Sequence, residues 1–183
     1  MHQISVSGLM PQVLHKHVAS NRGKWVIIAL AAAFVVGILA GVIWLSLRSA
    51  DSRDFEAAKQ RLDQARASRS FEIGVYAMDG YINGGWYRTH RYEAYLLKGS
   101  MFEMQKDYSQ ALLAYREAER YDSEAQGAEY EAIARVSEQN GDTSTAIAYY
   151  QKTLDRVPDN APAATATRNW YKAKIQKLQE SKP

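Results

Sequence analysis

YLLKGSMFEMQKDYSQALLAYREAERYD, residues 95–122, is a stretch whose apolar side chains recur every three or four positions. The pattern is interrupted once, near Lys106 and Asp107. It therefore predicts two short amphipathic helices that pack against each other as a hairpin. A single hairpin cannot bury both apolar stripes, so we expect it to stack on further helices. The positions that form the stripes are Leu96, Leu97, Gly99, Phe102, Tyr108, Ala111, Tyr115 and Ala118.

A second copy of this pattern follows in residues 127–161, GAEYEAIARVSEQNGDTSTAIAYYQKTLDRVPDNA. Its offset from the first copy is 35 residues, as between Tyr95 and Tyr130. Pro158 stands where the second helix of this copy is expected to end, because proline cannot continue a helix. The chain thus contains an internal repeat. Further matching pairs are Gly99 with Ala134, Ala111 with Ala146, and Tyr115 with Tyr150.

The repeat resembles the tetratricopeptide repeat, a helical hairpin with a Leu-Gly pair and an aromatic on its first helix and an alanine and an aromatic on its second. Lys98 interrupts the Leu-Gly pair of the first copy, and Ser137 replaces an aromatic in the second. The resemblance implies an all-α chain with a right-handed solenoid, in which residues 91–126 and 127–160 are repeats. The matching residues are Leu97, Gly99, Phe102, Ala111, Tyr115 and Ala118 in the first copy and Ala134, Ala146, Tyr150 and Pro158 in the second.

Two flanking segments extend this array. Residues 53–90 predict a degenerate third hairpin, since about three repeats are usually needed for stability. The glycines of NGGWYRTHR, residues 83–91, end that hairpin. Residues 162–180 predict a capping helix that starts at Pro162. In this helix we expect one apolar stripe of Trp170, Ile175 and Leu178, and a solvated face of Arg168, Lys172, Lys174 and Lys177.

Residues 25–47, WVIIALAAAFVVGILAGVIWLSL, contain no charged residue. An α-helix of this length is about 34 Å long, which spans the hydrocarbon core of a bilayer. Trp25 and Trp44 lie near its ends, where indole rings prefer the headgroup level. The alternative is a cleaved signal peptide, but the apolar run exceeds the usual length and Arg48 stands where a cleavage site needs a small residue. We therefore expect an uncleaved transmembrane helix.

The charges that flank this helix predict its orientation. Lys16, Arg22 and Lys24 precede it, whereas the bases that follow it are balanced by Asp51 and Asp54. The positive-inside rule makes residues 1–24 a cytoplasmic tail and places the C-terminal domain outside the cytoplasm.

Within the apolar segment, Ala33, Gly37 and Gly41 recur every fourth residue. Such a strip of small residues lets another membrane helix approach closely, which predicts helix–helix pairing in the membrane. The alternative is a strip without a partner, because small residues are common in membrane helices.

Composition argues against several classes of function. Without cysteine, the chain forms neither a disulfide nor a thiolate metal site. Its net charge of +3 comes from the four bases of residues 1–50, so the remainder is nearly neutral and lacks a basic face for nucleic acid. His90 is the only histidine of the C-terminal domain, and no nucleophile or oxyanion motif accompanies it. We expect no catalysis, metal or cofactor.

The resemblance implies that first helices of successive repeats line a concave groove. The lining has an acidic bias and suits an extended peptide or a partner helix. We expect Glu103 and Arg135 to be exposed there. By this resemblance, the groove is lined by Glu93, Leu96, Ser100, Glu103 and Met104 from one repeat and by Glu131, Arg135, Glu138 and Gln139 from the next.

An aromatic cluster around two adjacent glycines offers a second candidate surface. Trp86 and Tyr87 in this loop could form a platform for a peptide or glycan, because aromatic rings supply large contact area. The alternative is that the cluster, which also contains Tyr81, Tyr92 and Tyr95, is core between the first two repeats.

These features predict a membrane-anchored scaffold or adaptor in the inner membrane of a bacterial envelope. Its periplasmic repeat domain would dock a protein partner of an envelope, secretion or motor assembly. The alternative is a periplasmic holdase chaperone attached to the translocation machinery, which would bind many unfolded clients weakly. Neither function needs a cofactor or nucleic acid.

Overall fold

The computed structural model describes residues 12–85, 87–122, 127–158 and 162–181. Within these ranges the chain is all-helical, with seven helices and no strand, which confirms the predicted all-α class. The helices are α1 (Gln12–Ala67), α2 (Phe71–Asn83), α3 (Arg91–Met104), α4 (Tyr108–Tyr121), α5 (Ala128–Gln139), α6 (Thr143–Arg156) and α7 (Pro162–Glu180).

Helix α1 includes the apolar segment and continues beyond it. The sequence pattern predicts two separate helices here, one over residues 25–47 and one that begins near residue 53. Residues 48–54, RSADSRD, contain neither proline nor glycine, so no residue in them interrupts the backbone hydrogen bonds of a helix. The chain divides after Leu47 into two units, residues 1–47 and 48–183, and each is described by itself.

In the first unit, α1 is long and apolar enough to cross a membrane. Every residue from Lys24 to Ser46 is exposed. A helix with apolar side chains on all sides is stable when its surroundings are themselves apolar, as in a bilayer.

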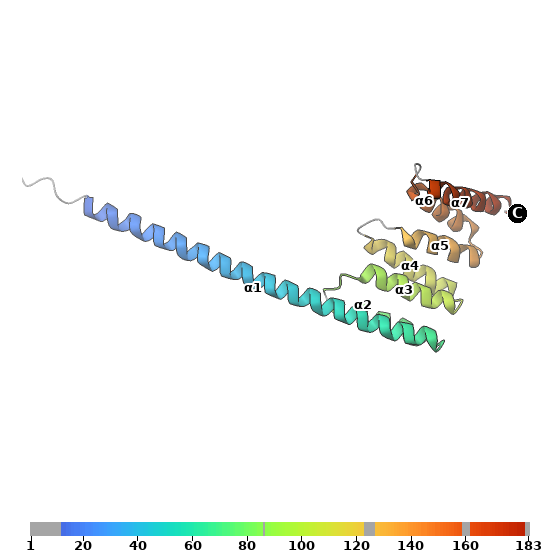
Figure 1. Cartoon of the computed structure of the whole chain (residues 1–183), viewed down its shortest axis with the longest axis horizontal. Coiled ribbons are helices and arrows are strands. Elements are labelled where there is room, and N and C mark those ends of the chain that lie inside the picture. The colour runs from blue at the N-terminus through green and yellow to red at the C-terminus, as the bar shows by residue number, and fades with distance from the viewer. Residues whose placement is uncertain (1–11, 86, 123–126, 159–161, 182–183) are drawn as a thin grey trace, which may run out of the picture. The chain divides into compact units, whose positions relative to one another are not determined.

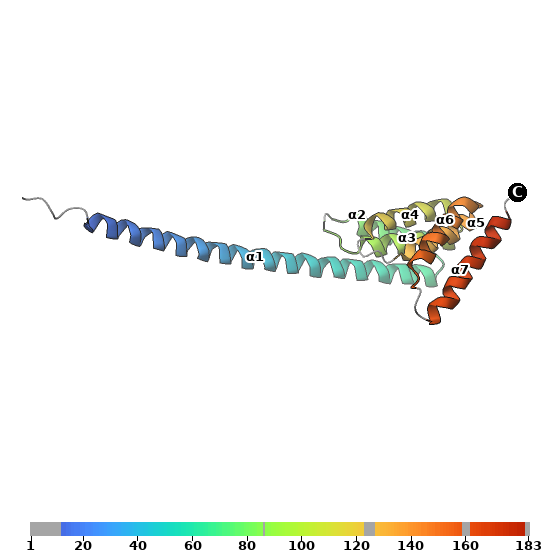
Figure 2. The ribbon, with the colours of Figure 1, turned by 90° about the horizontal axis from the view of Figure 1, so that it is seen from above.

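In the second unit, each helix packs on its neighbours in the chain. Helices α3 and α4 form one hairpin and α5 and α6 another. Contacts also join α2 to α3, α4 to α5 and α6 to α7, so the helices lie side by side in chain order (Figure 1). Figure 2 shows α7 at the end of this stack, next to α6.

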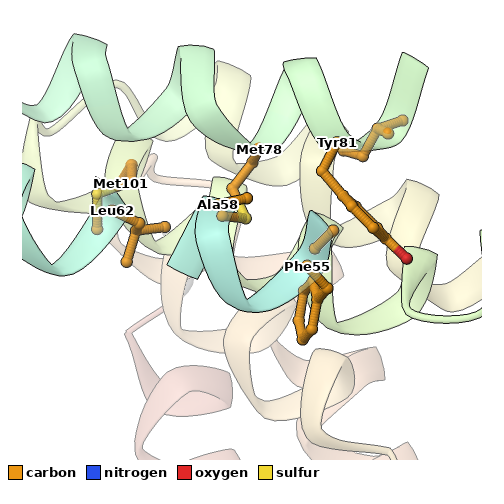
Figure 3. Packing of buried hydrophobic residues seen from close by; sticks show 8 residues of the cluster. Phe55, Ala58, Leu62, Met78, Tyr81 and Met101 are labelled. Carbon is orange, nitrogen blue, oxygen red and sulfur yellow. The ribbon is translucent and has the colours of Figure 1, made fainter. Parts of the chain in front are cut away.

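Three apolar clusters hold the stack together. The first joins the C-terminal part of α1 to α2 and α3, and Figure 3 shows Leu62 beside Met101 and Ala58 beside Met78 in it. The second cluster joins α5, α6 and α7. The third joins α3, α4 and α5 and includes Ala111 and Tyr115. Each cluster is shared by at least three helices, so no single hairpin buries its apolar stripes alone.

The two central hairpins turn in the same way. Asp107 and Asp142, 35 positions apart, are the N-caps of α4 and α6, and each accepts a hydrogen bond from a backbone N–H three residues later. The residues before these caps, Lys106 and Gly141, both have a positive φ, of 62° and 81°. The repeat seen in the sequence is therefore also a repeat of backbone geometry.

A close contact fixes the crossing of α3 and α4. A Cβ atom added at Gly99 would lie 2.6 Å from the Cε1 atom of Tyr115, so only glycine allows this approach. At the matching place in the next hairpin, Ala134 is fully buried in the cluster that contains Tyr150.

Helix α7 differs in detail from its prediction. Trp170 is 53% exposed, and its neighbour Tyr171 is buried in its place with Ile175 and Leu178. Two of the basic residues expected to be solvated are also engaged. Arg168 donates hydrogen bonds to the carbonyl oxygens of Leu154 and Val157, and Lys174 lies 2.8 Å from Glu138. The prediction is confirmed for Ile175 and Leu178 and wrong for Trp170, because Tyr171 has the helical spacing of four and seven residues from these two positions.

Candidate partner-binding face

Polar contacts link the first helix of each hairpin to the first helix of the next. Arg66 of α1 donates to the Ser100 hydroxyl of α3 at 2.8 Å. Arg135 of α5 then bonds Glu103 of α3, and α7 bonds two glutamates of α5. We call the surface that carries these contacts the first-helix face. It comprises Arg66, Ser100, Glu103, Met104, Glu131, Arg135, Glu138, Gln139, Tyr171 and Lys174.

Glu103 is the centre of this face. Arg135 donates to its carboxylate twice, Nε to Oε1 at 2.8 Å and Nη2 to Oε2 at 3.0 Å. The Tyr115 hydroxyl donates to Oε2 at 2.9 Å. Burial opposes ionisation of Glu103, but the hydrogen bonds and charge of Arg135, with the Tyr115 hydroxyl, lower its pKa below the ordinary value. The carboxylate is therefore ionised and held in one position.

The next repeat has the same arrangement. Glu138, 35 positions after Glu103, accepts from the Tyr150 hydroxyl at 3.1 Å, and Tyr150 is 35 positions after Tyr115. Lys174 of α7 supplies the cation, with Nζ 2.8 Å from Oε1. In both repeats a carboxylate of the first helix thus accepts a hydrogen bond from a tyrosine on the second helix of the same hairpin. It also binds a cation from the helix that follows this hairpin in the chain, α5 or α7.

The structure places the predicted groove residues in different environments. The exposure predicted for Arg135 is confirmed, at 45% of its side chain. The exposure predicted for Glu103 is wrong, because only 23% of its side chain remains exposed beneath the three hydrogen bonds that it accepts. Leu96 is also largely removed from this face, since it packs against the cluster of α3, α4 and α5. Met104 and Gln139 are exposed.

The other predicted residues of the groove have polar contacts. Glu131 accepts from the Tyr171 hydroxyl at 2.8 Å. Glu93 lies 4.0 Å from the imidazole of His90 and is half-buried. The face is therefore a set of mutually bonded side chains, with Met104 and Gln139 exposed beside them.

The aromatic loop is in part core. Trp86 lies outside the described residues, and Tyr87 is half-buried. Tyr81 and Tyr92 are buried, and their hydroxyls donate to Asp51 and Glu129. For these two tyrosines the interpretation as core between the first repeats is confirmed.

The sequence indicated Asp51 only as a charge that flanks the apolar segment and did not reveal that it is buried. Its buried carboxylate accepts hydrogen bonds from the Tyr81 hydroxyl at 2.7 Å and from the Thr89 backbone N–H and hydroxyl, at 2.9 and 2.5 Å. Burial opposes its ionisation, but these bonds and Arg88 lower its pKa. A signal was present, because Asp51 lies four residues before Phe55 and so extends the apolar stripe of α1.

In the apolar segment, Ala33, Gly37 and Gly41 are exposed. Apart from the chain neighbours and the adjoining backbone of the same helix, no described atom lies within 4 Å of a Cβ atom placed at either glycine. The strip of small residues is therefore open to a further helix within the described part of the chain.

No protein-family model matches the chain, and no curated protein matches it.

Among the described residues, no group of three or more histidine or acidic side chains is arranged to hold a metal ion.

Proposed function

We propose that this protein is a membrane-anchored adaptor whose helical domain docks a partner protein on the first-helix face. The observation that carries the proposal is the row of bonded side chains that successive first helices contribute, from Ser100 through Glu103 and Arg135 to Glu138. The likeness of the repeats to tetratricopeptide repeats supports the same interpretation, since that family binds proteins along its first helices.

Hydrogen bonds between side chains of the first-helix face reduce the entropy that is lost when a partner binds. Glu103 and Arg135 are already held by hydrogen bonds, so a partner would order few side chains on binding them. Met104 and Gln139, 35 positions apart, present exposed side chains at equivalent places in the two repeats. A regular spacing of this kind suits an extended peptide or a helix that runs across both hairpins.

The charges of the first-helix face are balanced. Its three glutamates are matched by three cations, Arg66, Arg135 and Lys174, and the last two are paired with glutamates. A partner segment with charged side chains of both signs would match this face, and its association would weaken as the salt concentration rises.

The test changes the exposed pair while leaving the bonded side chains in place. Met104→Lys with Gln139→Lys adds two cations to the face, and we expect the partner to be lost from the tagged full chain isolated from native membranes. Leu113→Lys with Ala148→Lys is the matched control, because these exposed residues are also 35 positions apart but lie on the second helices. Mass spectrometry of the co-isolated proteins measures both. Equal retention of the partner by the two double variants would contradict the proposal.

We also propose a location in the inner membrane of a bacterial envelope, with residues 1–24 in the cytoplasm and the domain in the periplasm. The bases Lys16, Arg22 and Lys24 support this orientation. A reporter enzyme that is active only outside the cytoplasm should work when fused after Pro183 and fail when fused after Lys24. The reverse pattern would exclude this orientation.

A further inference from the structure

A groove lies between α1 and α2, and none of its lining residues belongs to the first-helix face. Its volume is about 470 Å³. The α1 side is formed by residues 54–61 and the α2 side by residues 73–81. Both sides belong to the unit that begins at Arg48.

The rim of the groove is apolar and exposed. Tyr76 is 81% exposed, more than any other large apolar residue described between 48 and 183, and Ile73 is 60% exposed. The wall is made of small residues, Ala57, Ala77 and Gly80, and a Cβ atom at Gly80 would meet nothing within 4 Å. Large rim residues above a wall of small ones are what a packing helix requires, because its ridge of side chains can enter the groove.

The opposite end of the stack shows how such a surface is covered. There α7 lays Tyr171, Ile175 and Leu178 against α6. No described helix covers the outer side of α1 and α2 in this way. Terminal elements of a repeat array are soluble when their outer face is polar, so the apolar rim at Ile73 and Tyr76 indicates a binding surface rather than a cap.

The charges of the groove define what its occupant must carry. Arg88 is already paired, with Asp54 at 2.9 Å and Asp51 at 3.4 Å. Arg61 is exposed, and no hydrogen-bond or ion-pair partner is found for it in the described part of the chain. An occupant of the groove therefore meets one cation that is free to bind a carboxylate.

We propose that this groove binds an amphipathic α-helix of another protein, which packs an apolar stripe against Ile73 and Tyr76 and places a carboxylate beside Arg61. The second interface is independent of the first-helix face. The adaptor then holds two different helices or peptides at once, one on the first-helix face and one with a carboxylate in the α1–α2 groove.

The absence of cysteine from the sequence allows a direct test on the full chain. Ala57→Cys places a thiol on the groove wall with little change in volume, and Ala148→Cys places one at an exposed alanine of α6 as the control. The rate of reaction with a maleimide is measured in native membrane fragments and in vesicles of the same lipids that contain only the purified chain. We expect the thiol at position 57 to react about tenfold more slowly in native membranes, which corresponds to a partner concentration about nine times its Kd. The thiol at position 148 should react equally in both.

Reversing the charge of Arg61 then tests whether this residue binds the carboxylate of the occupant. Adding Arg61→Glu to the Ala57→Cys chain should restore fast labelling in native membranes, whereas Arg53→Glu, an exposed arginine that does not line the groove, should not. Melting curves of both variants check that the fold is kept. Equal labelling of the Ala57→Cys chain in the two preparations would overturn the proposal. Slow labelling in the purified vesicles would also overturn it, since a second copy or lipid would then cover the groove, as would protection that survives Arg61→Glu.

Discussion

At the scale of single residues, a tyrosine hydroxyl that donates to a carboxylate is the recurrent contact of this domain. Buried aromatic rings fill the spaces beside small residues, and their hydroxyls then need a partner. Burial, followed by the charge and hydrogen bond of Glu131, raises the pKa of Tyr171 to about 12, so its hydroxyl remains a donor at neutral pH. The pairs are Tyr81–Asp51, Tyr92–Glu129, Tyr115–Glu103, Tyr149–Glu119, Tyr150–Glu138 and Tyr171–Glu131.

We predict that Asp51→Ala lowers the free energy of unfolding by about 3 kcal/mol, because it leaves the buried hydroxyl of Tyr81 without its acceptor and also removes the acceptor of the two Thr89 donors. Asp54→Ala is the matched control. Asp54 also binds Arg88, but its side chain is 56% exposed, so its removal should cost less than about 1 kcal/mol. Urea unfolding of the full chain measures both, and equal losses would contradict the assigned role of Asp51.

The pKa of Glu129 affects how the stability of the fold changes with pH. The effect has the opposite sign to that of most carboxylates, whose pKa is lowered on folding. It is fully buried, one carboxylate oxygen has no hydrogen-bond partner among the described residues, and burial, aided by the charge of Asp122, raises its pKa above the ordinary value of 4.5. The folded state therefore binds this proton more tightly than the unfolded state. The stability that this provides is present below pH 4.5 and is lost as the pH rises through the folded pKa.

Glu129→Gln removes this ionisation, and the new side chain can still accept the hydrogen bond of Tyr92. We expect the variant to be more stable than the parent at pH 7 and the difference to vanish below pH 4.5. Glu72→Gln, at an exposed position of α2, serves as the control. Urea unfolding at several pH values decides the matter, and a variant that is less stable than the parent at pH 7 would refute this interpretation.

At the scale of elements, the same turn joins the helices of both central hairpins. The position before the N-cap is in the left-handed region in each case, but it is Lys106 in one hairpin and Gly141 in the other. A side chain at such a position strains the backbone, whereas glycine does not. The two turns therefore share one backbone geometry, and Gly141 adopts it with less strain than Lys106 does.

We predict that Lys106→Gly raises the free energy of unfolding by about 0.5 to 1 kcal/mol and that Gly141→Lys lowers it by a similar amount. Both positions are exposed, so packing changes little in either variant. Urea unfolding of the two variants beside the parent provides the measurement. Changes of the same sign at the two positions would show that their backbone geometry does not control the turn.

Periodicity in the sequence predicts helices well and the contacts between them poorly. The stripes of α3 to α6 are visible because spacings of three and four follow from helix geometry alone. Helical spacing does distinguish the two adjacent aromatics of α7, because Tyr171 lies four residues before Ile175 whereas Trp170 lies five before it, so the predicted stripe departed from the period of a helix at Trp170. The continuity of α1 was missed because the change from apolar to polar residues after Leu47 resembles an end of a helix, although no helix-breaking residue is present.

The bonded pairs of the candidate face could not be predicted for a related reason. Glu103 and Arg135 are 32 residues apart, and their contact depends on how α5 is rotated against α3. The sequence shows that both are polar and on first helices, but not that they bind each other. Asp51 could have been predicted, because a charged residue in register with an apolar stripe must find a buried partner.

At the scale of the whole molecule, two kinds of surface belong to one chain. The first unit is an apolar helix that needs apolar surroundings, and the second is a nearly neutral helical array with its own three clusters of buried residues. The described residues offer no site for a metal ion. We propose that the exposed residues of the first-helix face carry the function of the array.

The central claim is that one partner binds the first-helix face, and photo-crosslinking in living cells tests it most directly. A photoreactive phenylalanine analogue is placed in the full chain at Met104, which is 48% exposed on that face, or at Leu113, which is 56% exposed on the second helix of the same hairpin. The account predicts a single crosslinked product of defined mass from position 104 and none from position 113. A product from position 113 alone would contradict it, and a broad range of products from both positions would instead indicate a holdase chaperone.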